Sequence, residues 1–370
     1  KTLDRVRYIA PKVLALITGD SKNSWYKKVT SNNGETQTVN FVPMSNGLCS
    51  LSDIYVEIST TVTQQGSDGQ QTEKVQTKLE TLAAVIQKRV LSLNPAMMTF
   101  SQIDFTPYVG RFGKTKQGVF NTFPGFPHRP ADNGVELDYT PIMPFLNGMK
   151  EIICNNDDSF FQCVCDTYSD LLQYPERKSR VCSVYYSPEQ QVGKGLFSLL
   201  LGTALVGEKM IVQVANDSLI IGDFNALLEN KLLIVVDESE SHGVSYKFSG
   251  RLKNLITEPT TLINRKGFDA FKVCSCLRVM YCTNTIDALQ IDLFDKRFFM
   301  LQCNPSRIGQ TAFFDQMETI AKEHGWLLWN FFYHRKLSRK DWKNHLPSTH
   351  LKQQMMQRKF PTPIQFVISC

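Results

Sequence analysis

The residues Gly193-Lys194-Gly195 are the part of the sequence best suited to chemistry. They follow an apolar segment that ends at Tyr186 and precede an apolar run that begins at Leu196. In a strand–loop–helix unit, backbone N–H groups at the start of the helix can bind phosphate oxygens, and a lysine adds a positive charge there. The usual pattern is GxxxxGK[S/T], and the sequence departs from it at Pro188 and Gly195. Taken alone, these residues predict phosphate binding only weakly.

Polar residues that follow two later apolar runs strengthen this interpretation. Asp237 and Glu238 come directly after the aliphatic run 232–236, and Asn284 follows another apolar run. Adjacent carboxylates can hold Mg²⁺ through water and polarise a water molecule for attack, and an amide can orient that water. Arg297 is of the type that stabilises developing charge from a neighbouring subunit. The structural alternatives are a helix cap, a turn asparagine and a surface salt bridge.

Three short apolar segments can form the strands that position these residues. They are 181–186, 231–236 and 273–282. Each ends in polar residues, and segments with helical character separate them. This order predicts a parallel α/β sheet with its site along the carboxyl edge of the strands. Further helices are predicted over 73–93, 141–174 and 311–332, and further strands over 36–42 and 54–62.

The predicted organisation has four parts. They are a mixed α/β linker or collar (1–120), a helical lead-in (121–180), the core (181–310) and a helical region with a basic tail (311–370). The first part contains no convincing pair of carboxylates for nucleotidyl transfer. Because the chain begins at Lys1 instead of a methionine, we expect it to be a piece of a longer protein.

The composition excludes several classes of protein. With 42% hydrophobic and 21% charged residues, the chain is not wholly disordered, collagen-like or a coiled coil. Its longest apolar stretch, 196–207, is about half of what a membrane span needs. The ten cysteines are scattered without a CxxC pair, which favours buried free thiols over a zinc site. We therefore expect an intracellular protein without a membrane segment.

The positive charge is concentrated near the carboxyl terminus. Between His334 and Lys359, eight lysines and arginines are opposed only by Asp341, whereas the whole chain has a net charge of +6. A basic segment that also contains Trp342 could bind phosphates. A solvated helical face that ends in a tail is an equally good interpretation.

The order of these motifs resembles the superfamily 3 helicases. Within them it is similar to the NTPase domain attached to primase-polymerases of phages, large DNA viruses and related mobile elements. The resemblance covers about half of the chain, from Phe120 to Cys303. Besides the glycine-lysine loop and the Asp-Glu strand, the matching segments are 121–126, 173–178, 222–225, 252–259 with 264–267, 283–284 and 295–297.

The resemblance implies a P-loop NTPase core of the AAA+-like (ASCE) type that binds ATP and Mg²⁺. It assigns Gly193, Lys194 and Gly195 to the phosphates of ATP. It assigns Asp237 to nucleotide and to Mg²⁺, which it would hold through water, and Glu238 to the attacking water. The catalytic set that we expect consists of Lys194, Asp237, Glu238, Asn284 and Arg297.

The resemblance also implies a hexameric ring. Asn284 would act as the sensor of the nucleotide, and Arg297 as a finger that completes the site of the neighbouring subunit. Lys266 would contact the DNA backbone from a hairpin in the central channel, and Lys253 is a weaker DNA-binding candidate. Such contacts hold the strand by charge and are insensitive to base sequence.

The resulting hypothesis is an ATP-dependent DNA helicase. We expect it to move 3′ to 5′ on single-stranded and fork DNA in the replication of a viral or mobile-element genome. A primase or polymerase module would belong to the same chain, and the protein would work in a bacterial cytoplasm, a viral replication site or a nucleus. The alternative is a nucleotide-binding DNA clamp or replication initiator with little or no motor activity. A small-molecule P-loop kinase is a more remote interpretation.

Overall fold

The computed structural model of the chain describes its residues in several ranges. They are 14–17, 24–32, 37–43, 55–65, 71–86, 99–100, 102–107, 119–132, 134–215, 225–237, 246–264, 270–286, 289, 291–292 and 295–357. Internal contacts divide the chain into two compact units. The first comprises Lys1–Asp104 and Lys114–Pro124, and the second comprises Phe105–Gly113 and Gly125–Cys370.

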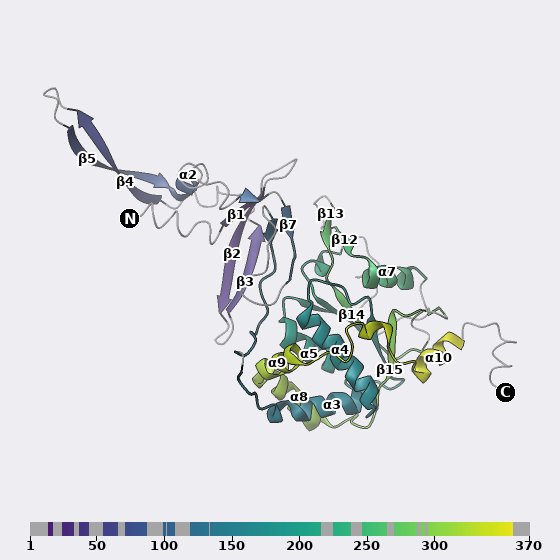
Figure 1. Cartoon of the computed structure of the whole chain (residues 1–370). Helices are drawn as coiled ribbons and strands as arrows, with labels where there is room; N and C mark the ends of the chain where they lie inside the picture. The colour runs from purple at the N-terminus through teal and green to yellow at the C-terminus, as the bar shows by residue number, and fades with distance from the viewer. Residues whose placement is uncertain are drawn as a thin grey trace, which may run out of the picture. The chain divides into compact units, whose positions relative to one another are not determined.

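The described residues of the first unit lie mainly in β-strands (Figure 1). One sheet has the order β3-β2-β1-β6. Its strands are β1 (Leu14–Ile17), β2 (Ser24–Asn32), β3 (Gln37–Pro43) and β6 (Thr99–Phe100). Two further pairs are β4 (Tyr55–Gln65) with β5 (Gln71–Thr81), and β7 (Gln102–Asp104) with β8 (Val119–Asn121). The strands predicted over 36–42 and 54–62 are thereby confirmed as β3 and β4.

The helix predicted over 73–93 is wrong for residues 73–81 and confirmed for Leu82–Val85, which form α2, whereas residues 87–93 lie outside the description. Residues 71–81 form β5, which is antiparallel to β4 along eleven residue pairs. The side chains of Val75 and Leu79 are 64% and 58% exposed, so they do not form the buried stripe of an amphipathic helix. The ladder to β4 satisfies the backbone groups of the whole segment and outweighs a weak local helical preference.

The second unit is built on a five-stranded sheet in which every strand is parallel, with the order β10-β11-β14-β9-β15. Its strands are β9 (Cys182–Tyr186), β10 (Ile211–Val214), β11 (Leu233–Asp237), β14 (Arg278–Thr283) and β15 (Phe298–Gln302). The predicted parallel α/β sheet is thus confirmed. The strand predicted over 273–282 is divided, because its first residues belong to β13 (Phe271–Cys274), which pairs with β12 (Thr260–Ile263).

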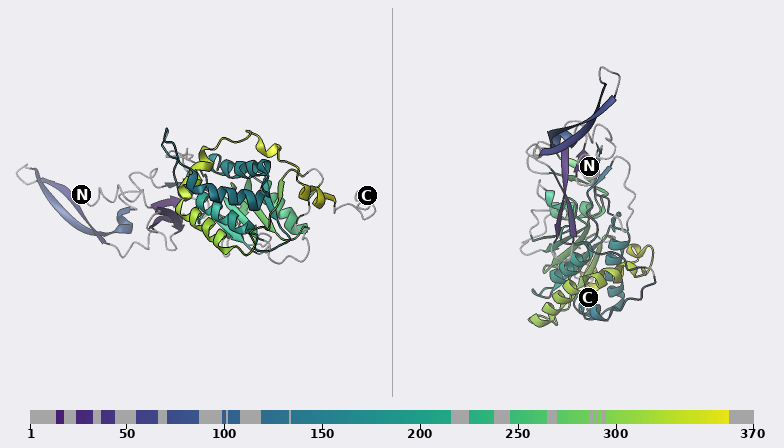
Figure 2. Two further views of the ribbon diagram at one scale, coloured as in Figure 1. Left: turned by 90° about the horizontal axis from the view of Figure 1, so that it is seen from below. Right: turned by 90° about the vertical axis from the view of Figure 1, so that its left-hand side faces the viewer.

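Helices cover both faces of this sheet. The group on one face comprises α3 (Met143–Cys154), α4 (Asp158–Gln173), α5 (Lys194–Val206), α8 (Thr311–Glu323) and α9 (Gly325–His334), as Figures 1 and 2 show. On the other face lie α7 (Tyr246–Thr257) and α10 (His350–Gln357). Neighbouring residues of β14 reach both layers. Tyr168 of α4 donates a hydrogen bond to Met280 Sδ (3.2 Å), and Phe248 of α7 packs on Tyr281.

The helices predicted over 141–174 and 311–332 are confirmed, each as two helices. Asp157 starts α4 by accepting a hydrogen bond from the Phe160 N–H (2.9 Å), and Asn155 ends α3 in a left-handed conformation. Among the described residues, no helix is long and apolar enough to cross a membrane, and no three His, Cys, Asp or Glu residues are grouped to hold a metal ion.

A buried ion network attaches α4 to the sheet. The Asp170 carboxylate forms ion pairs with Arg278 at the start of β14 (3.0 Å) and with Arg177 (2.5 Å). Asp170 is fully buried, and Arg278 also donates to the carbonyl oxygen of Tyr174 (2.9 Å). The network therefore holds the segment 174–181, which leads into β9, against the sheet.

The basic C-terminal segment is attached to the core where the structure describes it. Arg335 forms an ion pair with the buried Asp166, and Lys352 donates to the Phe298 carbonyl oxygen (3.0 Å). The Trp342 side chain is 2% exposed, so it offers no free ring for stacking on a nucleic-acid base. The interpretation as a solvated face is therefore wrong for Arg335 and Lys352, and residues beyond 357 lie outside the description.

We predict that Asp170→Asn lowers the free energy of unfolding by about 3–5 kcal/mol, because it leaves the buried Arg278 without its counter-charge. Chemical denaturation measures this loss. Asp158→Asn in the same helix is the control and should cost less than about 1 kcal/mol, because the Asp158 side chain is 84% exposed. Equal losses in the two variants would contradict the role given to the buried network.

The same ion network predicts a dependence on pH. Burial alone would raise the pKa of the Asp170 carboxyl, but Arg278 and Arg177 outweigh burial and lower it. A lowered carboxyl pKa contributes stability above the unfolded value, and this contribution is lost as the pH falls through the folded value. The stability difference between the protein and Asp170→Asn should therefore shrink below about pH 4.

Candidate nucleotide site

Five of the predicted site residues line one cavity at the carboxyl edge of the sheet. The cavity has a volume of about 570 Å³ and lies where the loop 187–193 joins β9 to α5. The predicted residues that line it are Gly193, Lys194, Gly195, Asp237 and Asn284. Parallel strands bring these residues together because their carboxyl ends meet at one edge.

Asn284 holds the loop 187–193 in place. From the residue after β14, its amide Nδ2 donates to the carbonyl oxygens of Ser187 (2.8 Å) and Glu189 (2.7 Å). Both amide hydrogens are thereby used, which leaves the side-chain oxygen to accept a hydrogen bond from the cavity. Gln191 has a φ of 60° and Gly193 a φ of 97°, so the loop turns sharply just before α5 begins.

Gly193 and Gly195 lie where a side chain would not fit. A Cβ at Gly193 would lie 2.6 Å from Cε1 of Phe314 on α8. A Cβ at Gly195 would lie 3.0 Å from Asp237 Oδ2, so the carboxylate occupies the space next to the first turn of the helix. This close approach gives a physical reason for a glycine where the usual pattern has a serine or threonine.

Lys194 provides a buried positive charge at the start of α5. The residue is 6% exposed, and none of the described residues accepts a hydrogen bond from its Nζ. Burial lowers the pKa of its ammonium group, while Asp237 and Glu189 act in the opposite direction. No described side chain caps this helix, so its first N–H groups are available too. An anion in the cavity would neutralise the charge of Lys194 and accept hydrogen bonds from these N–H groups.

Asp237 is placed to take part in binding a metal ion. Its carboxylate lies at the end of β11, beside Gly195, and Gln213 Nε2 of β10 donates to its Oδ2 (3.3 Å). A carboxylate completed by phosphate oxygens and water is the donor set that Mg²⁺ prefers, so these residues fit a magnesium-bound triphosphate. The sequence analysis missed Gln213, although a polar residue in the apolar strand 211–214 was a usable signal.

Two other predicted residues lie away from this cavity. Arg297 precedes β15 at the opposite edge of the sheet and forms a two-point ion pair with Asp295, with distances of 2.9 and 2.7 Å. Lys253 on α7 forms an ion pair with Asp292 (2.9 Å). Neither residue lines the cavity of Lys194, so Arg297 can act on a nucleotide only at another subunit. Their roles stay predictions.

The remaining predicted residues are outside the description. Glu238 follows β11, and Lys266 lies between β12 and β13, but the structure describes neither residue, nor 222–224 of the matching segment 222–225. The strands β12 and β13 do form an antiparallel pair around the segment that contains Lys266. The assignments of a catalytic base and of a DNA contact to these residues therefore rest on the sequence alone.

Comparisons with known proteins point to phage proteins. A family of unknown function, DUF5906, matches residues 185–297. A DNA primase-polymerase of Nitratiruptor phage NrS-1 is 27% identical over 136 residues, which are 36% of this chain and 18% of the length of that relative. Two apo structures of the NrS-1 C-terminal region have TM-scores of 0.66 and 0.61 at 16% and 15% identity. They cover 98% and 96% of this chain, and 76% and 74% of their own chains, and show a shared fold.

We predict that Gly193→Ala destabilises the protein more than Gly309→Ala does. Both glycines have a left-handed φ, which costs an alanine about 1–2 kcal/mol. At Gly309 nothing lies within 4 Å of the added methyl group, whereas at Gly193 the methyl group must displace Phe314 at a further cost of about 1–3 kcal/mol. Urea unfolding of both variants measures the difference, and equal losses would show that the contact with Phe314 is unimportant.

Proposed function

We propose that the chain is the ATP-hydrolysing motor part of a phage DNA-replication protein and acts as a helicase. The observation that carries the proposal is the buried ammonium group of Lys194, which forms no ion pair with a described residue and lines a cavity with Asp237 at the start of α5. A triphosphate with Mg²⁺ would supply the negative charge that this arrangement lacks.

Each residue of the site would have its own role in ATP binding and hydrolysis. Lys194 and the first N–H groups of α5 bind the phosphates, and the two glycines keep side chains out of their way. Asn284 fixes the loop and orients a water molecule through its free oxygen. Glu238, from the sequence analysis, accepts the proton of that water. Asp237 would hold a Mg²⁺ ion, which would supply positive charge next to the phosphates.

Hydrolysis would require a second subunit. Arg297 lies at the edge of the sheet opposite to the cavity of Lys194, so its guanidinium cannot complete the site of its own chain. In a head-to-tail ring the two edges of neighbouring subunits face each other. The ion pair with Asp295 would then fix the position of the Arg297 side chain before assembly. To complete the neighbouring site, the guanidinium of Arg297 would have to leave Asp295.

The comparisons support the replication context of this proposal. The sequence relative with a known activity is a phage DNA primase-polymerase, and the solved structures of similar fold are of the C-terminal region of NrS-1. The sequence match spans 18% of that relative, so a primase or polymerase module of this protein is itself part of the proposal. Single-stranded DNA and a second copy of the chain are the proposed partners.

One observation favours the alternative of a nucleotide-binding clamp or initiator with weak turnover. Within a single chain, Arg297 is engaged by Asp295 and is not available to a nucleotide. If ring assembly does not release it, the protein would bind ATP and DNA without acting as a motor. Assays of turnover and of subunit cooperation separate the two functions.

The first test is steady-state ATP hydrolysis with and without single-stranded DNA, with the solution mass measured in parallel. We predict DNA-stimulated turnover by a ring-sized particle. Lys194→Ala should weaken nucleotide binding by about 10–100-fold, the usual value of a charged hydrogen bond. Lys322→Ala removes an exposed lysine of α8 and serves as the control.

The results have definite consequences. Full ATPase activity of Lys194→Ala would reject the proposed phosphate site. A monomer that binds ATP but does not hydrolyse it, with or without DNA, would favour the binding module over the motor.

A second prediction tests the ring. Lys194→Ala and Arg297→Ala should each be inactive alone, but rings that contain both should recover activity at interfaces that combine an intact Lys194 with an intact Arg297. With random mixing these are about one quarter of the interfaces. Co-expression with two affinity tags and an ATPase assay measure the recovery.

Two features keep this test interpretable. In Arg297→Ala, Asp295 retains Lys253 at 3.9 Å, so the fold should survive, and thermal unfolding checks this. A mixed ring with no more activity than either variant alone would show that Arg297 does not act across an interface.

A further inference from the structure

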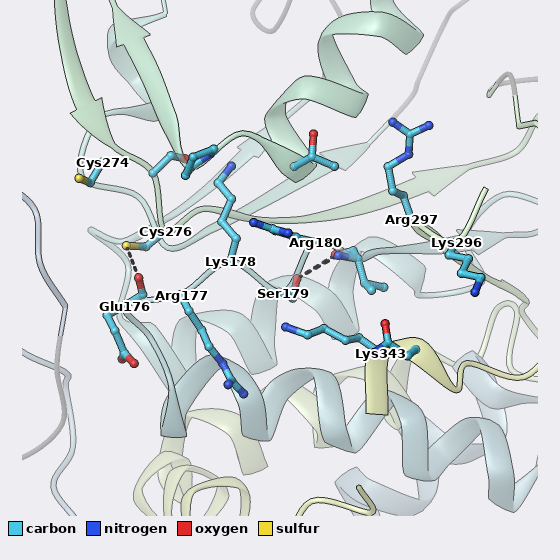
Figure 3. Close-up of a pocket in the computed structure, with 15 residues that line it drawn as sticks. Glu176, Arg177, Lys178, Ser179, Arg180, Cys274, Cys276, Lys296, Arg297 and Lys343 are labelled. Atoms are coloured by element: carbon cyan, nitrogen blue, oxygen red, sulfur yellow. Dashed lines mark hydrogen bonds between the residues drawn. The ribbon is translucent and has the colours of Figure 1, made fainter. Parts of the chain in front are cut away.

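A second cavity lies at the amino edge of the core sheet, opposite to the site of Lys194. It has a volume of about 840 Å³ and is shown in Figure 3. Its walls come from the segments that lead into β9, β14 and β15, together with Lys343 of the short helix η6 (Trp342–Asn344). Because the strands are parallel, these three lead-in segments meet at the same edge.

The cavity is lined mainly by positive charge. Among the described residues that line it, the lysines and arginines are Arg177, Lys178, Arg180, Lys296, Arg297 and Lys343, and the one acidic residue is Glu176. Arg177 is paired with Asp170, and Arg297 with Asp295. For the other four, no carboxylate among the described residues lies within ion-pair distance. The cavity therefore gathers four positive charges that form no ion pair with a described residue.

Two of these charges, Lys178 and Lys343, are partly withdrawn from water, whereas Arg180 and Lys296 are exposed. Burial lowers the pKa of Lys178 to about 8, although the nearby Cys276 and Glu258 act in the opposite direction. Burial also lowers the pKa of Lys343, where Asp170 opposes the shift and Arg177 and Arg180 add to it. Lys178 does donate a hydrogen bond to the Leu255 carbonyl oxygen, but a carbonyl dipole does not replace a counter-ion. A bound anion would relieve the repulsion among these side chains.

The backbone at Arg180 gives an independent indication. Its φ of 60° is left-handed, a conformation that costs a residue with a Cβ about 1–2 kcal/mol relative to glycine. Strained backbone conformations of this kind gather at functional sites. Arg180 lines the cavity and is exposed to solvent, and Figure 3 shows its side chain beside that of Lys178.

We propose that this amino-edge cavity is a second anion site, which binds two or more phosphate groups of a polyanionic ligand. Two phosphates match the number of positive charges left uncompensated more closely than a single carboxylate does. None of the described residues that line the cavity is aromatic, so binding depends on charge and is insensitive to base identity. The phosphates can belong to a single-stranded DNA backbone or to a free polyphosphate chain. The inference goes beyond the proposed ATPase function and does not rest on it.

The test neutralises two residues of the cavity without touching the Lys194 site or Arg297. Arg180→Gln/Lys343→Gln removes two positive charges from the cavity. Arg129→Gln/Lys322→Gln removes the same two charges from exposed positions that do not line it and is the matched control. Binding of a fluorescently labelled oligothymidine is measured by anisotropy over a range of KCl concentrations.

If a DNA strand binds the cavity, the salt dependence changes in a defined way. The slope of log K against log [KCl] should fall by about 1.4 in the cavity variant, because each lost phosphate contact on a single strand contributes about 0.7. The control should keep the slope of the unaltered protein. The single variant Lys343→Gln should lose about half as much, which provides a second measurement if the double variant is poorly folded.

A second arm distinguishes the source of the phosphates. Binding of inorganic tripolyphosphate is measured by calorimetry in the Lys194→Ala background, so that the nucleotide site does not contribute. Loss of tripolyphosphate binding in the cavity variant, with an unchanged oligothymidine slope, would assign the site to a free polyphosphate chain. If both ligands bind the cavity variant and the control alike, the proposal is overturned.

Two controls separate this proposal from the proposed function. Removal of mutually repelling charges should leave the melting temperature of the apo cavity variant unchanged or raised, so a loss of binding is not a loss of fold. ATP hydrolysis without DNA is measured on the same samples. A protein without ATPase activity that still loses phosphate binding in the cavity variant would reject the motor function and retain the second anion site.

Discussion

The common direction of the five core strands is the constraint on which the rest of the second unit depends. Because β10, β11, β14, β9 and β15 are all parallel, every carboxyl end lies at one edge and every amino end at the other. The first edge gathers Lys194, Asp237 and Asn284, although they come from distant parts of the chain. The second edge gathers the segments that precede β9, β14 and β15.

Both edges carry lysines or arginines that form no ion pair with a described residue. At the carboxyl edge this charge is the single buried ammonium group of Lys194, next to two glycines that leave room for a ligand. At the amino edge it is a group of lysines and arginines in a larger cavity. Elsewhere in the core the same protein pairs its buried cations, as Asp170 does with Arg278. This contrast supports an anion as the partner of each edge.

The solved structures of similar fold share 15–16% of their residues with this chain, so their likeness concerns the backbone arrangement. Activity has to be argued from the residues at the two edges. The proposed motor connects the edges directly. In a ring, the carboxyl edge of one subunit would meet the amino edge of the next, where Arg297 and the second cavity lie. The pairing of Arg297 with Asp295 would then distinguish a free edge from an assembled one.

Much of the core could be predicted from the sequence alone. Strands buried on both faces read as continuous apolar runs, which is why β9 and β11 were located correctly, and their polar ends placed Asp237 at the correct edge. The site around Lys194 was found because Asp237 and Asn284 follow later apolar runs and strengthen a glycine-lysine pattern that is weak by itself. These features could be predicted because each run or motif depends on residues that are close together in the sequence.

Only the tertiary structure decided the features that depend on distant partners. Residues 71–81 became a strand because β4 was available to pair with them. The reason for a glycine at position 195 is the Asp237 carboxylate, which lies against it. Gln213 belongs to the site because its side chain donates a hydrogen bond to the same carboxylate. The amino-edge cavity combines segments that are far apart in the sequence, such as 176–181 and 274–276, so no local sequence pattern predicts it. The spacing of apolar residues along the sequence shows which face of a segment can be buried. It does not show which distant segment will pack or pair with that face, because this is decided only when the sheet forms.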